Sequence, residues 1–217
     1  IDFLACLVAA IELKVPIILC NHDLVKSEWK IISNDFPASL FIGREPLVNN
    51  HKKPIRLDPS SVLIPSGGSS FAKPKFVIQD WANLVSESLM VRDFLKGDSL
   101  NSVCCLPLYH ASGLMQVVRA IATKGKILFT SLGKLEEDLA LIDEEKFFLS
   151  LVPTQLVKLI CNGEVSNNLK KLKGIFLGGA KANQKTLAKS LELKLPIIIC
   201  YGMSETAGMI AAQRKEE

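Results

Sequence analysis

The sequence predicts an α/β fold in which parallel sheets are covered by helices on both faces. Short apolar runs recur along the 217 residues and alternate with stretches of helical length and pattern. The chain is 48% hydrophobic and 22% charged, which is enough to bury the core of one large domain or of two tightly joined domains. These two observations leave one large domain and two joined domains open.

The elements follow from the apolar runs, taken in order. The first stretch predicts a buried helix through Leu13, capped by Asp2. The runs after it predict strands at Val15–Cys20, Leu40–Ile42, Val62–Ile64, Phe76–Ile78, Val103–Cys105, Ile127–Phe129, Phe148–Leu151, Ile175–Leu177 and Ile197–Cys200. Helices are predicted between them at Trp81–Leu95, Gly113–Thr123, Leu135–Glu144, Pro153–Cys161 and Gln184–Leu191. Asp80 suits the N-cap of the first of these helices, and Pro153 suits a first helical turn.

Two segments of the chain match almost residue for residue. Glu12–Cys20 reads ELKVPIILC and Glu192–Cys200 reads ELKLPIIIC, and in both a helix end leads into a buried strand. One interpretation is two related lobes with a ligand crevice between them. The other is that any junction from a helix to a parallel strand uses such residues. In either case Tyr201 follows the carboxyl end of a strand, where open α/β sheets bind ligands.

Charge and hydropathy exclude several classes of protein. The net charge is only +4 and the lysines are scattered among acids, so nucleic-acid binding is not expected. The densest basic group, Lys170–Lys173, is explained equally well as a solvated helix end. The apolar stretch Phe3–Ile11 is far shorter than the roughly 20 residues that a membrane span needs, so no membrane insertion is expected. We expect a cytoplasmic enzyme.

The cysteines predict neither a disulfide framework nor a metal site. No pair has the C-x-x-C spacing, and most lie in apolar runs. We expect all six to be reduced core residues, with catalytic or metal-binding thiols as the alternative. They lie at positions 6, 20, 104, 105, 161 and 200.

The segment Ile199–Gly208 carries the parts of a nucleotide site. Tyr201 can cover a base, and Gly202 allows a ligand to approach the backbone closely. The Ser204 hydroxyl can bind a phosphate oxygen and the Glu205 carboxylate can bind Mg²⁺. The alternative is a strand that leads into a helix capped by Ser204.

Two further segments favour the same chemistry. In Ser61–Lys75, a Gly/Ser cluster precedes Lys73 and Lys75, so that hydroxyls and open amides lie beside positive charge, as an anion site requires. The spacing is not that of a Walker-type P-loop, and a flexible linker is the alternative. In Cys104–Leu114, an apolar strand end is followed by Pro107, Tyr109 and His110. A structural role is the alternative for this histidine.

Together these segments resemble the adenylate-forming superfamily of acyl-CoA synthetases, luciferases and peptide-synthetase adenylation domains. That family has a Ser/Thr/Gly/Lys loop, then Leu-Pro-Leu-x-His, then Gly-Gly-Ala, then Tyr-Gly-Met-Thr-Glu-Thr. The four segments occur here in the same order, at Pro65–Lys75, Leu106–His110, Gly178–Ala180 and Tyr201–Thr206. Four matches in sequence are far more specific than any one of them.

Within this superfamily the chain resembles o-succinylbenzoate-CoA ligases of the cyanobacterial and plastid kind, which serve menaquinone and phylloquinone biosynthesis. Ile64–Ser70, Lys75–Trp81 and Ser150–Leu156 carry this likeness. The chain departs from the family where Phe71 and Ala72 stand in place of the glycine that normally closes the phosphate loop. The alternative within the superfamily is another acyl- or aryl-CoA synthetase.

The resemblance implies an enzyme that uses ATP with Mg²⁺ to activate a carboxylic acid as an acyl-adenylate and then forms the thioester with CoA. The catalytic residues implied are His110 beside the carboxylate, Lys75 at the phosphates and Glu205 on Mg²⁺. The phosphates are assigned to Ser66, Gly67, Gly68, Ser69, Ser70 and, at the α-phosphate, Ser204. The adenine and acyl-pocket walls are assigned to Gly178, Gly179, Ala180, Tyr201, Gly202 and Met203.

The resemblance also implies that residues 1–217 are part of an N-terminal adenylation core of up to two lobes. The family's ribose-binding Asp, its hinge and the small C-terminal domain with its catalytic Lys then lie outside these residues. Two other functions stay open, namely a nucleotide-binding chain that is catalytically incomplete and an unrelated α/β domain whose glycine-rich turns are structural. The expected partners are a small carboxylic acid, ATP and CoA, with a homodimer as an open alternative to a monomer.

Overall fold

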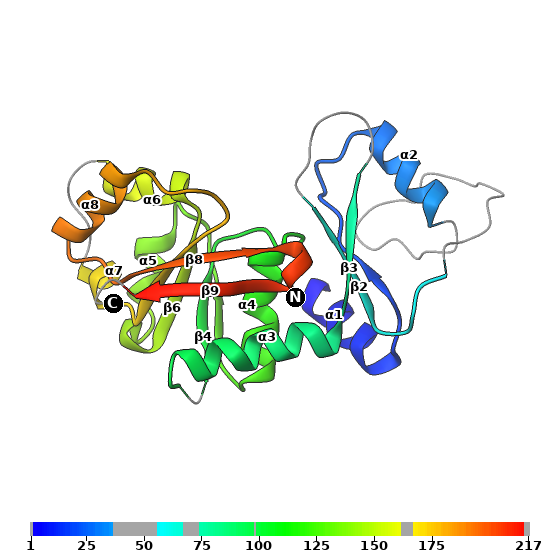
Figure 1. The fold of residues 1–217 in the computed structure, drawn as a ribbon, viewed down its shortest axis with the longest axis horizontal. Helices are drawn as coiled ribbons and strands as arrows, with labels where there is room; N and C mark the ends of the chain where they lie inside the picture. The colour runs from blue at the N-terminus through cyan, green and yellow to red at the C-terminus, as the bar shows by residue number, and fades with distance from the viewer. Residues whose placement is uncertain (1, 37–55, 67–73, 98, 162–166, 215–217) are drawn as a thin grey trace. The chain divides into compact units, whose positions relative to one another are not determined.

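The computed structural model describes residues 2–36, 56–66, 74–97, 99–161 and 167–214, which belong to two compact units (Figure 1). The first unit is Ile1–Trp81 and the second is Ala82–Glu217. Among the described residues, none of the helices has the length and apolar character that crossing a membrane requires.

The first unit contains a small mixed sheet in the order β1-β2-β3. Its elements are α1 (Asp2–Leu13), β1 (Ile17–Ile18), α2 (Lys26–Asp35), β2 (Ser61–Pro65) and β3 (Phe76–Asp80). β1 is parallel to β2, as predicted, but β2 and β3 are antiparallel. The helix α2 was not predicted, and the strand predicted at Leu40–Ile42 lies outside the described residues. Ile32, Phe36 and Leu63 form a buried cluster in this unit.

The second unit contains the larger sheet, in the order β5-β4-β6-β7-β8-β9. The strands are β4 (Asn101–Cys104), β5 (Ile127–Phe129), β6 (Phe147–Leu151), β7 (Gly174–Leu177), β8 (Ile197–Met203) and β9 (Gly208–Arg214). All are parallel except β9, which runs antiparallel to β8. The α/β class is therefore confirmed. β9 was not predicted, because its short residues Gly208, Ala211 and Ala212 interrupt the apolar pattern.

Helices lie against both faces of this sheet. They are α3 (Trp81–Phe94), α4 (Ala111–Ala122), α5 (Leu135–Leu139), α6 (Pro153–Ile160), α7 (Asn167–Lys171) and α8 (Gln184–Glu192), with a 3₁₀ turn at Glu144–Lys146. The helix predicted at Leu135–Glu144 thus ends five residues early, at Leu139, and α7 was not predicted. The remaining boundaries agree with the prediction to within three residues.

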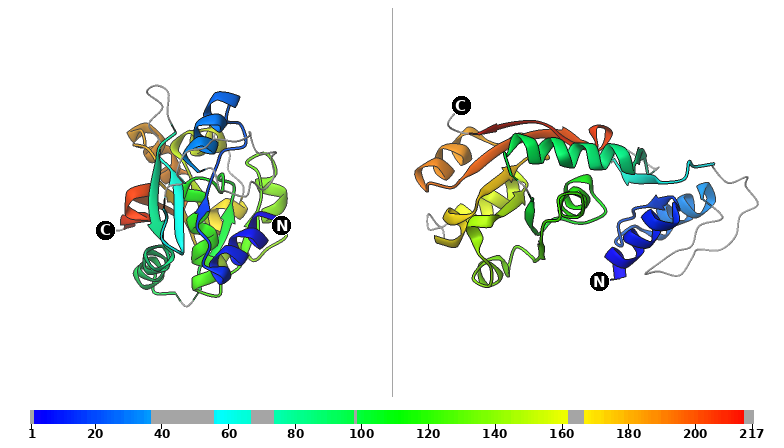
Figure 2. Two further views of the ribbon diagram at one scale, coloured as in Figure 1. Left: turned by 90° about the vertical axis from the view of Figure 1, so that its right-hand side faces the viewer. Right: turned by 90° about the horizontal axis from the view of Figure 1, so that it is seen from below.

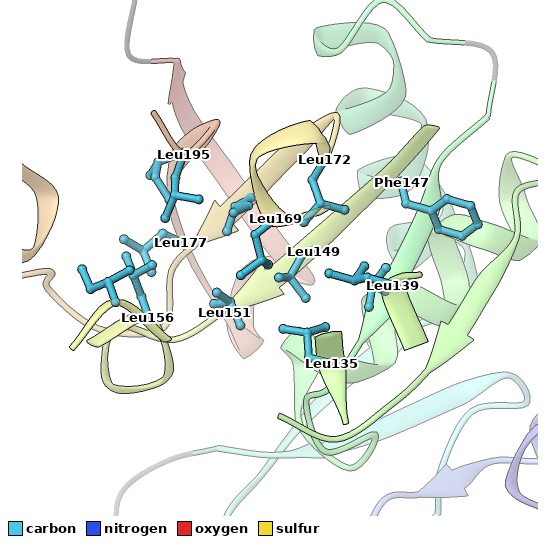
Figure 3. Close-up of a cluster of buried hydrophobic side chains, with 14 residues drawn as sticks. Leu135, Leu139, Phe147, Leu149, Leu151, Leu156, Leu169, Leu172, Leu177 and Leu195 are labelled. Atoms are coloured by element: carbon cyan, nitrogen blue, oxygen red, sulfur yellow. The ribbon is translucent and has the colours of Figure 1, made fainter. Parts of the chain in front are cut away.

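Alternate residues of the strands fill two separate cores. On one face, Leu149, Leu151 and Leu177 pack with Leu135, Leu139 and Leu156 of the covering helices (Figure 3). On the other face, Phe148, Phe176 and Ile198 pack with Val91 of α3. The β8–β9 hairpin runs beside α3, as both Figure 1 and Figure 2 show. This alternation explains why the strands appear in the sequence as continuous apolar runs.

The two matching segments share one backbone device. Lys14 and Lys194 both have left-handed conformations, with φ of 52° and 58°. In each case the next amide reaches back to the helix, from Val15 N to Ala10 O at 2.9 Å and from Leu195 N to Ser190 O at 3.0 Å. Lys96 and Lys124 end α3 and α4 in the same way, with φ of 52° and 54°. Because the device recurs outside the matching segments, it favours a common helix-to-strand junction over a duplicated lobe.

Candidate functional site

The predicted site residues of the second unit lie at one edge of its sheet. Because β4, β7 and β8 are parallel, the segments that follow them emerge on the same side. His110 follows β4, Gly178–Ala180 follows β7, and Ser204–Thr206 follows β8. From β4 the chain adds β5 on one side of that strand, and it then adds β6, β7 and β8 in turn on the other side. The strand order therefore reverses between β4 and β6. Such an edge is where doubly wound sheets bind ligands.

The segment Tyr201–Gly208 forms a hairpin end. One turn of 3₁₀ helix, Ser204–Thr206, joins β8 to β9 and is followed by Ala207 at φ 57° and Gly208 at φ 126°. The Thr206 hydroxyl accepts the amide of Met203 at 3.1 Å and lies 2.8 Å from the carbonyl oxygen of Gly208. The alternative prediction, a helix capped by Ser204, is wrong, since a strand follows instead.

This hairpin end presents the side chains that the sequence singled out. Tyr201 is 58% exposed and Met203 is 41% exposed. Glu205 is exposed, and Ser204 is half-buried. The structure gives another reason for Gly202 than the close approach of a ligand, because a Cβ there would lie 1.9 Å from the carbonyl oxygen of Gly208. Gly202 therefore lets β9 approach β8.

A buried ion pair that the sequence analysis missed supports this hairpin end. Two guanidinium nitrogens of Arg119 in α4 donate to the two carboxylate oxygens of Glu87 in α3. The side chain of Glu87 is only 3% exposed and that of Arg119 only 8%. Glu87 Oε1 also accepts the amide of Met209 at 2.9 Å. The sequence feature that could have revealed the ion pair is an acidic residue on the buried face of a helix, between Leu84 and Val91.

The turn after β4 presents His110. The residue is the N-cap of α4, and its amide donates to the carbonyl oxygen of Pro107 at 3.2 Å. Gly113 is required here, since a Cβ would lie 2.1 Å from the same carbonyl oxygen. The rings of Tyr109 and His110 are 4.5 Å apart at their centroids. Although His110 is exposed overall, desolvation of its ring lowers the pKa of the imidazole, so it is neutral at pH 7.

The glycine segment after β7 lies beside Tyr201. Leu177 pairs with Ile199, so the next residues of the two strands run side by side. A Cβ on Gly178 would lie 3.3 Å from the carbonyl oxygen of Cys200, and Gly179 adopts φ 80°. Gly179 and Ala180 are exposed. The structure thus brings Gly178–Ala180 to the strand that carries Tyr201, as an adenine wall built from both requires.

The helix α4 connects the hairpin end with His110. A Cβ on Gly208 would lie 3.2 Å from Met115 Cγ, so the hairpin end packs on α4. Met115 lies about 7 Å along the helix axis from its N-cap, given the rise of about 1.5 Å per residue. His110, Met115 and the turn Ser204–Thr206, called the acidic turn below, therefore belong to one region of the second unit.

The predicted phosphate-binding residues other than Ser204 belong to the first unit. Ser66 is half-buried and Lys75 is exposed, and the Ser66 amide donates to the Lys75 carbonyl oxygen at 3.0 Å. This bond extends the pairing of β2 with β3. The alternative of a flexible linker concerns residues outside the described ones and stays a prediction. Gly67, Gly68, Ser69 and Ser70 lie outside the described residues.

The described side chains fit Mg²⁺ only in company with a phosphate ligand. Among the residues that the structure describes, no group of three or more His, Cys, Asp or Glu side chains is placed to hold a metal ion. Protein-bound Mg²⁺ usually takes one or two carboxylates, with phosphate and water oxygens completing its octahedron. The exposed carboxylate of Glu205 suits this arrangement.

The thiols near the site are not poised for nucleophilic chemistry. Burial raises the pKa of Cys105 to about 11 and that of Cys200 to about 12, and it also raises the pKa of Cys104. All six cysteines are free, as predicted. The expectation that all are core residues is wrong for Cys161, which is exposed just after the end of α6.

Comparisons with known proteins show the family of this chain. The family described as AMP-binding enzyme matches residues 5–217. A 2-succinylbenzoate-CoA ligase of Staphylococcus aureus is 30% identical over 162 residues, which are 73% of this chain and 32% of that protein. The chain thus spans about a third of the length of the curated relatives that it matches.

Two solved structures share the fold. One is the o-succinylbenzoate coenzyme A synthetase (MenE) of Bacillus subtilis in complex with ATP and magnesium ion. It has a TM-score of 0.62 and 24% identity, covering 71% of this chain and 32% of that one. The other is E. coli MenE with a bound analogue of OSB-AMS, with a TM-score of 0.65 and 22% identity, covering 90% of this chain and 45% of that one.

Proposed function

Because the chain belongs to the AMP-binding enzyme family, we propose that it is the nucleotide-binding part of an ATP-dependent acid-CoA ligase. The observation that carries the proposal is the edge of the larger sheet, where an exposed tyrosine, a glycine segment and an acidic turn lie together. An aromatic ring beside open backbone suits a nucleobase, and a hydroxyl with a carboxylate suits a phosphate and its Mg²⁺.

The proposed reaction follows from the poor reactivity of a carboxylate. In the first step a carboxylate oxygen attacks the α-phosphorus of ATP, a P–O bond forms, and pyrophosphate leaves with the electron pair of the broken P–O bond. In the second step the sulfur of CoA attacks the acyl carbon, its proton is lost, and AMP leaves. Bound Mg²⁺ and fixed donors stabilise the charge that develops on the phosphate oxygens.

The residues take the following proposed roles. Glu205 holds Mg²⁺, and Ser204 donates to the α-phosphate. Tyr201, Gly202, Met203 and Gly178–Ala180 form the walls around adenine and the acyl group. His110, neutral at pH 7, donates or accepts a hydrogen bond beside the carboxylate without adding charge. The phosphates are assigned to Lys75, Ser66, Gly67, Gly68, Ser69 and Ser70.

We further propose 2-succinylbenzoate as the acid, which places the enzyme in menaquinone or phylloquinone biosynthesis. The support is the 30% identity to the 2-succinylbenzoate-CoA ligases of Staphylococcus aureus. Consumption of ATP and CoA is consistent with a cytoplasmic location. In this proposal residues 1–217 form part of the N-terminal adenylation core, with two lobes. Assembly as a homodimer stays a prediction, which light scattering tests.

Pyrophosphate release in the presence of ATP, Mg²⁺ and 2-succinylbenzoate tests the proposal. We expect release that depends on all three, and a Glu205→Gln variant that loses the Mg²⁺-dependent part. Glu192→Gln is the matched control, because Glu192 is an exposed carboxylate at the end of α8, paired with Lys189, and has no proposed role. Full activity of Glu205→Gln contradicts the metal assignment.

A second measurement separates binding from catalysis. Native-state binding of MgATP raises the melting temperature, so a shift with MgATP supports the nucleotide site whether or not turnover occurs. A shift without pyrophosphate release supports the alternative of a nucleotide-binding chain that is catalytically incomplete. No shift at millimolar MgATP contradicts the proposed nucleotide site.

A further inference from the structure

We propose that Glu87 is a positioning residue that sets the place of the acidic turn Ser204–Thr206 relative to His110. The inference rests on the proposed function, because it assigns a role in that site to a carboxylate that takes no part in the chemistry. Counted as whole residues, Glu87 is 5% exposed and Arg119 is 7% exposed, so neither is a surface charge. The role follows from what the Glu87 carboxylate contacts.

The Glu87 carboxylate has three donors. Arg119 donates to Oε2 from Nε at 3.2 Å and to Oε1 from the second guanidinium nitrogen. The Met209 amide donates to Oε1 at 2.9 Å. A bidentate guanidinium fixes both the position and the plane of a carboxylate, so Glu87 offers the Met209 amide an acceptor in one defined place.

The Met209 amide lies where the acidic turn meets β9. The register of β8 with β9 shifts between Tyr201 and Gly202, so the ladder is irregular beside this residue. Gly208 has no room for a side chain, since a Cβ would lie 2.9 Å from Glu87 Oε1. The start of β9 is therefore seated directly on the carboxylate, and the one-turn helix before it is held from that end.

The same pair fixes α4. Arg119 lies in the last turn of this helix, about two and a half turns beyond His110, and its guanidinium is also 5.9 Å from the centroid of the Phe176 ring. Movement of the arginine would move α4 along or about its axis, and His110 with it. Glu87 thus joins the two parts of the site through one carboxylate, with Met209 on one side and Arg119 on the other.

A directional role explains why the pair is charged. Apolar residues of similar volume often replace a buried ion pair without loss of stability. They pack, but they offer no acceptor to a backbone amide. An apolar replacement at both positions therefore separates packing from positioning.

The test compares wild type with the double variant Glu87→Leu/Arg119→Met, and with Val91→Ala as the matched control. Val91 lies on the same helix, is 3% exposed and packs in the cluster that contains Met209. The readouts are the Kd for MgATP, the Mg²⁺ concentration for half-maximal binding, and hydrogen exchange of the Ala207–Ile210 amides. All proteins are measured at a temperature at which circular dichroism shows each to be folded.

We expect the double variant to bind MgATP about tenfold more weakly, as loss of one charge-assisted hydrogen bond allows. Its Mg²⁺ requirement should rise, and the Ala207–Ile210 amides should exchange faster than in wild type. Val91→Ala should keep the wild-type Kd and exchange in this segment. Glu87→Gln, which keeps an acceptor oxygen, should bind MgATP more tightly than the double variant does.

A folded double variant with wild-type Kd and wild-type exchange at Ala207–Ile210 overturns the inference. Equal losses of MgATP affinity in the double variant and Val91→Ala also overturn it, since they indicate a purely structural role. A wild-type protein that binds no MgATP contradicts the proposed function instead. The exchange comparison then still decides whether Glu87 holds the turn.

Discussion

Two turns at the same edge of the larger sheet, one before α4 and one before β9, are stabilised by different interactions. The turn before α4 is fixed by its own backbone, where Gly113 packs against the carbonyl oxygen of Pro107. The turn before β9 has local hydrogen bonds of the Thr206 hydroxyl, but it is also held from a distance, by a hydrogen bond between Met209 and Glu87, which are 122 residues apart. One turn is therefore robust to changes elsewhere in the unit. The other depends on two helices being in place.

The difference also concerns charge. The Pro107–Gly113 turn uses neutral backbone groups, whereas the acidic turn rests on a buried carboxylate whose charge must be matched. Breaking such a pair at one partner leaves an unbalanced charge in the interior, which costs more than either partner contributes. Variants that unbalance the buried charge should therefore have larger effects than variants of the neutral turn.

The largest effect is expected from Arg119→Met. It leaves the Glu87 carboxylate buried without its cation, and unfolding by urea should show a loss of about 3–5 kcal/mol. The double variant Glu87→Leu/Arg119→Met should recover most of that loss, because no charge remains buried. Equal losses in the single and double variants would show that packing, rather than charge, supports the acidic turn.

Gly113→Ala should cost about 1–3 kcal/mol, as overpacking typically does, because the new Cβ meets a backbone oxygen that cannot move freely. Thermal unfolding measures the change. Gly133→Ala is the control, since nothing lies within 4 Å of its Cβ position. If Gly113→Ala changes MgATP binding but not hydrogen exchange at Ala207–Ile210, the turn before α4 and the turn before β9 are held independently. A neutral Gly113→Ala would contradict the close packing of this turn.

Lys194→Gly should stabilise the chain by about 1 kcal/mol, because glycine adopts the left-handed conformation of φ 58° without strain. Lys189→Gly, inside α8, is the matched control and should destabilise by about 1 kcal/mol. Both are local effects and should leave the two turns unchanged. Denaturation midpoints of the two variants, on opposite sides of wild type, check the prediction.

The smallest effect concerns pH. The pKa of His110 is lower in the folded chain than its usual value near 6.5, so the unfolded chain binds the proton more readily. The contribution of His110 to the free energy of unfolding is therefore fully present above about pH 6.5, and it falls as the pH drops from there toward the pKa of the folded chain. His110→Gln should remove this part of the pH dependence of the melting temperature. A melting temperature with the same pH profile in His110→Gln as in wild type would contradict this prediction.

The same contrast explains which elements could be predicted. The strand Phe147–Leu151 is an apolar run that is buried at every position, and its own residues predict it. Ile127–Phe129 is less buried, but its three residues are all apolar and predict a strand as well. β9 could not be predicted in this way, because the short residues Gly208, Ala211 and Ala212 interrupt its apolar pattern and because, among the described strands, it pairs with β8 alone. The short helix α7 has one buried residue, Leu169, and so gives almost no periodic signal.

The site residues divide along the same line. Tyr201, Glu205 and His110 stand in short local patterns that predict a nucleotide site. Glu87 and Arg119 carry no such pattern, since a single acid or base on a helix has no meaning until its partner is known. Gly202 was singled out correctly for its missing Cβ, but the backbone that approaches it is that of Gly208.

The sequence by itself determined the α/β class, most of the strands and the segments that carry the proposed chemistry, because hydrophobic period, capping and turn residues act over a few neighbours. Only the tertiary structure decided that the acidic turn is a hairpin end and that one buried carboxylate supports it. Both depend on pairing and charge compensation between distant residues, and those interactions exist only once the helices have packed on the sheet.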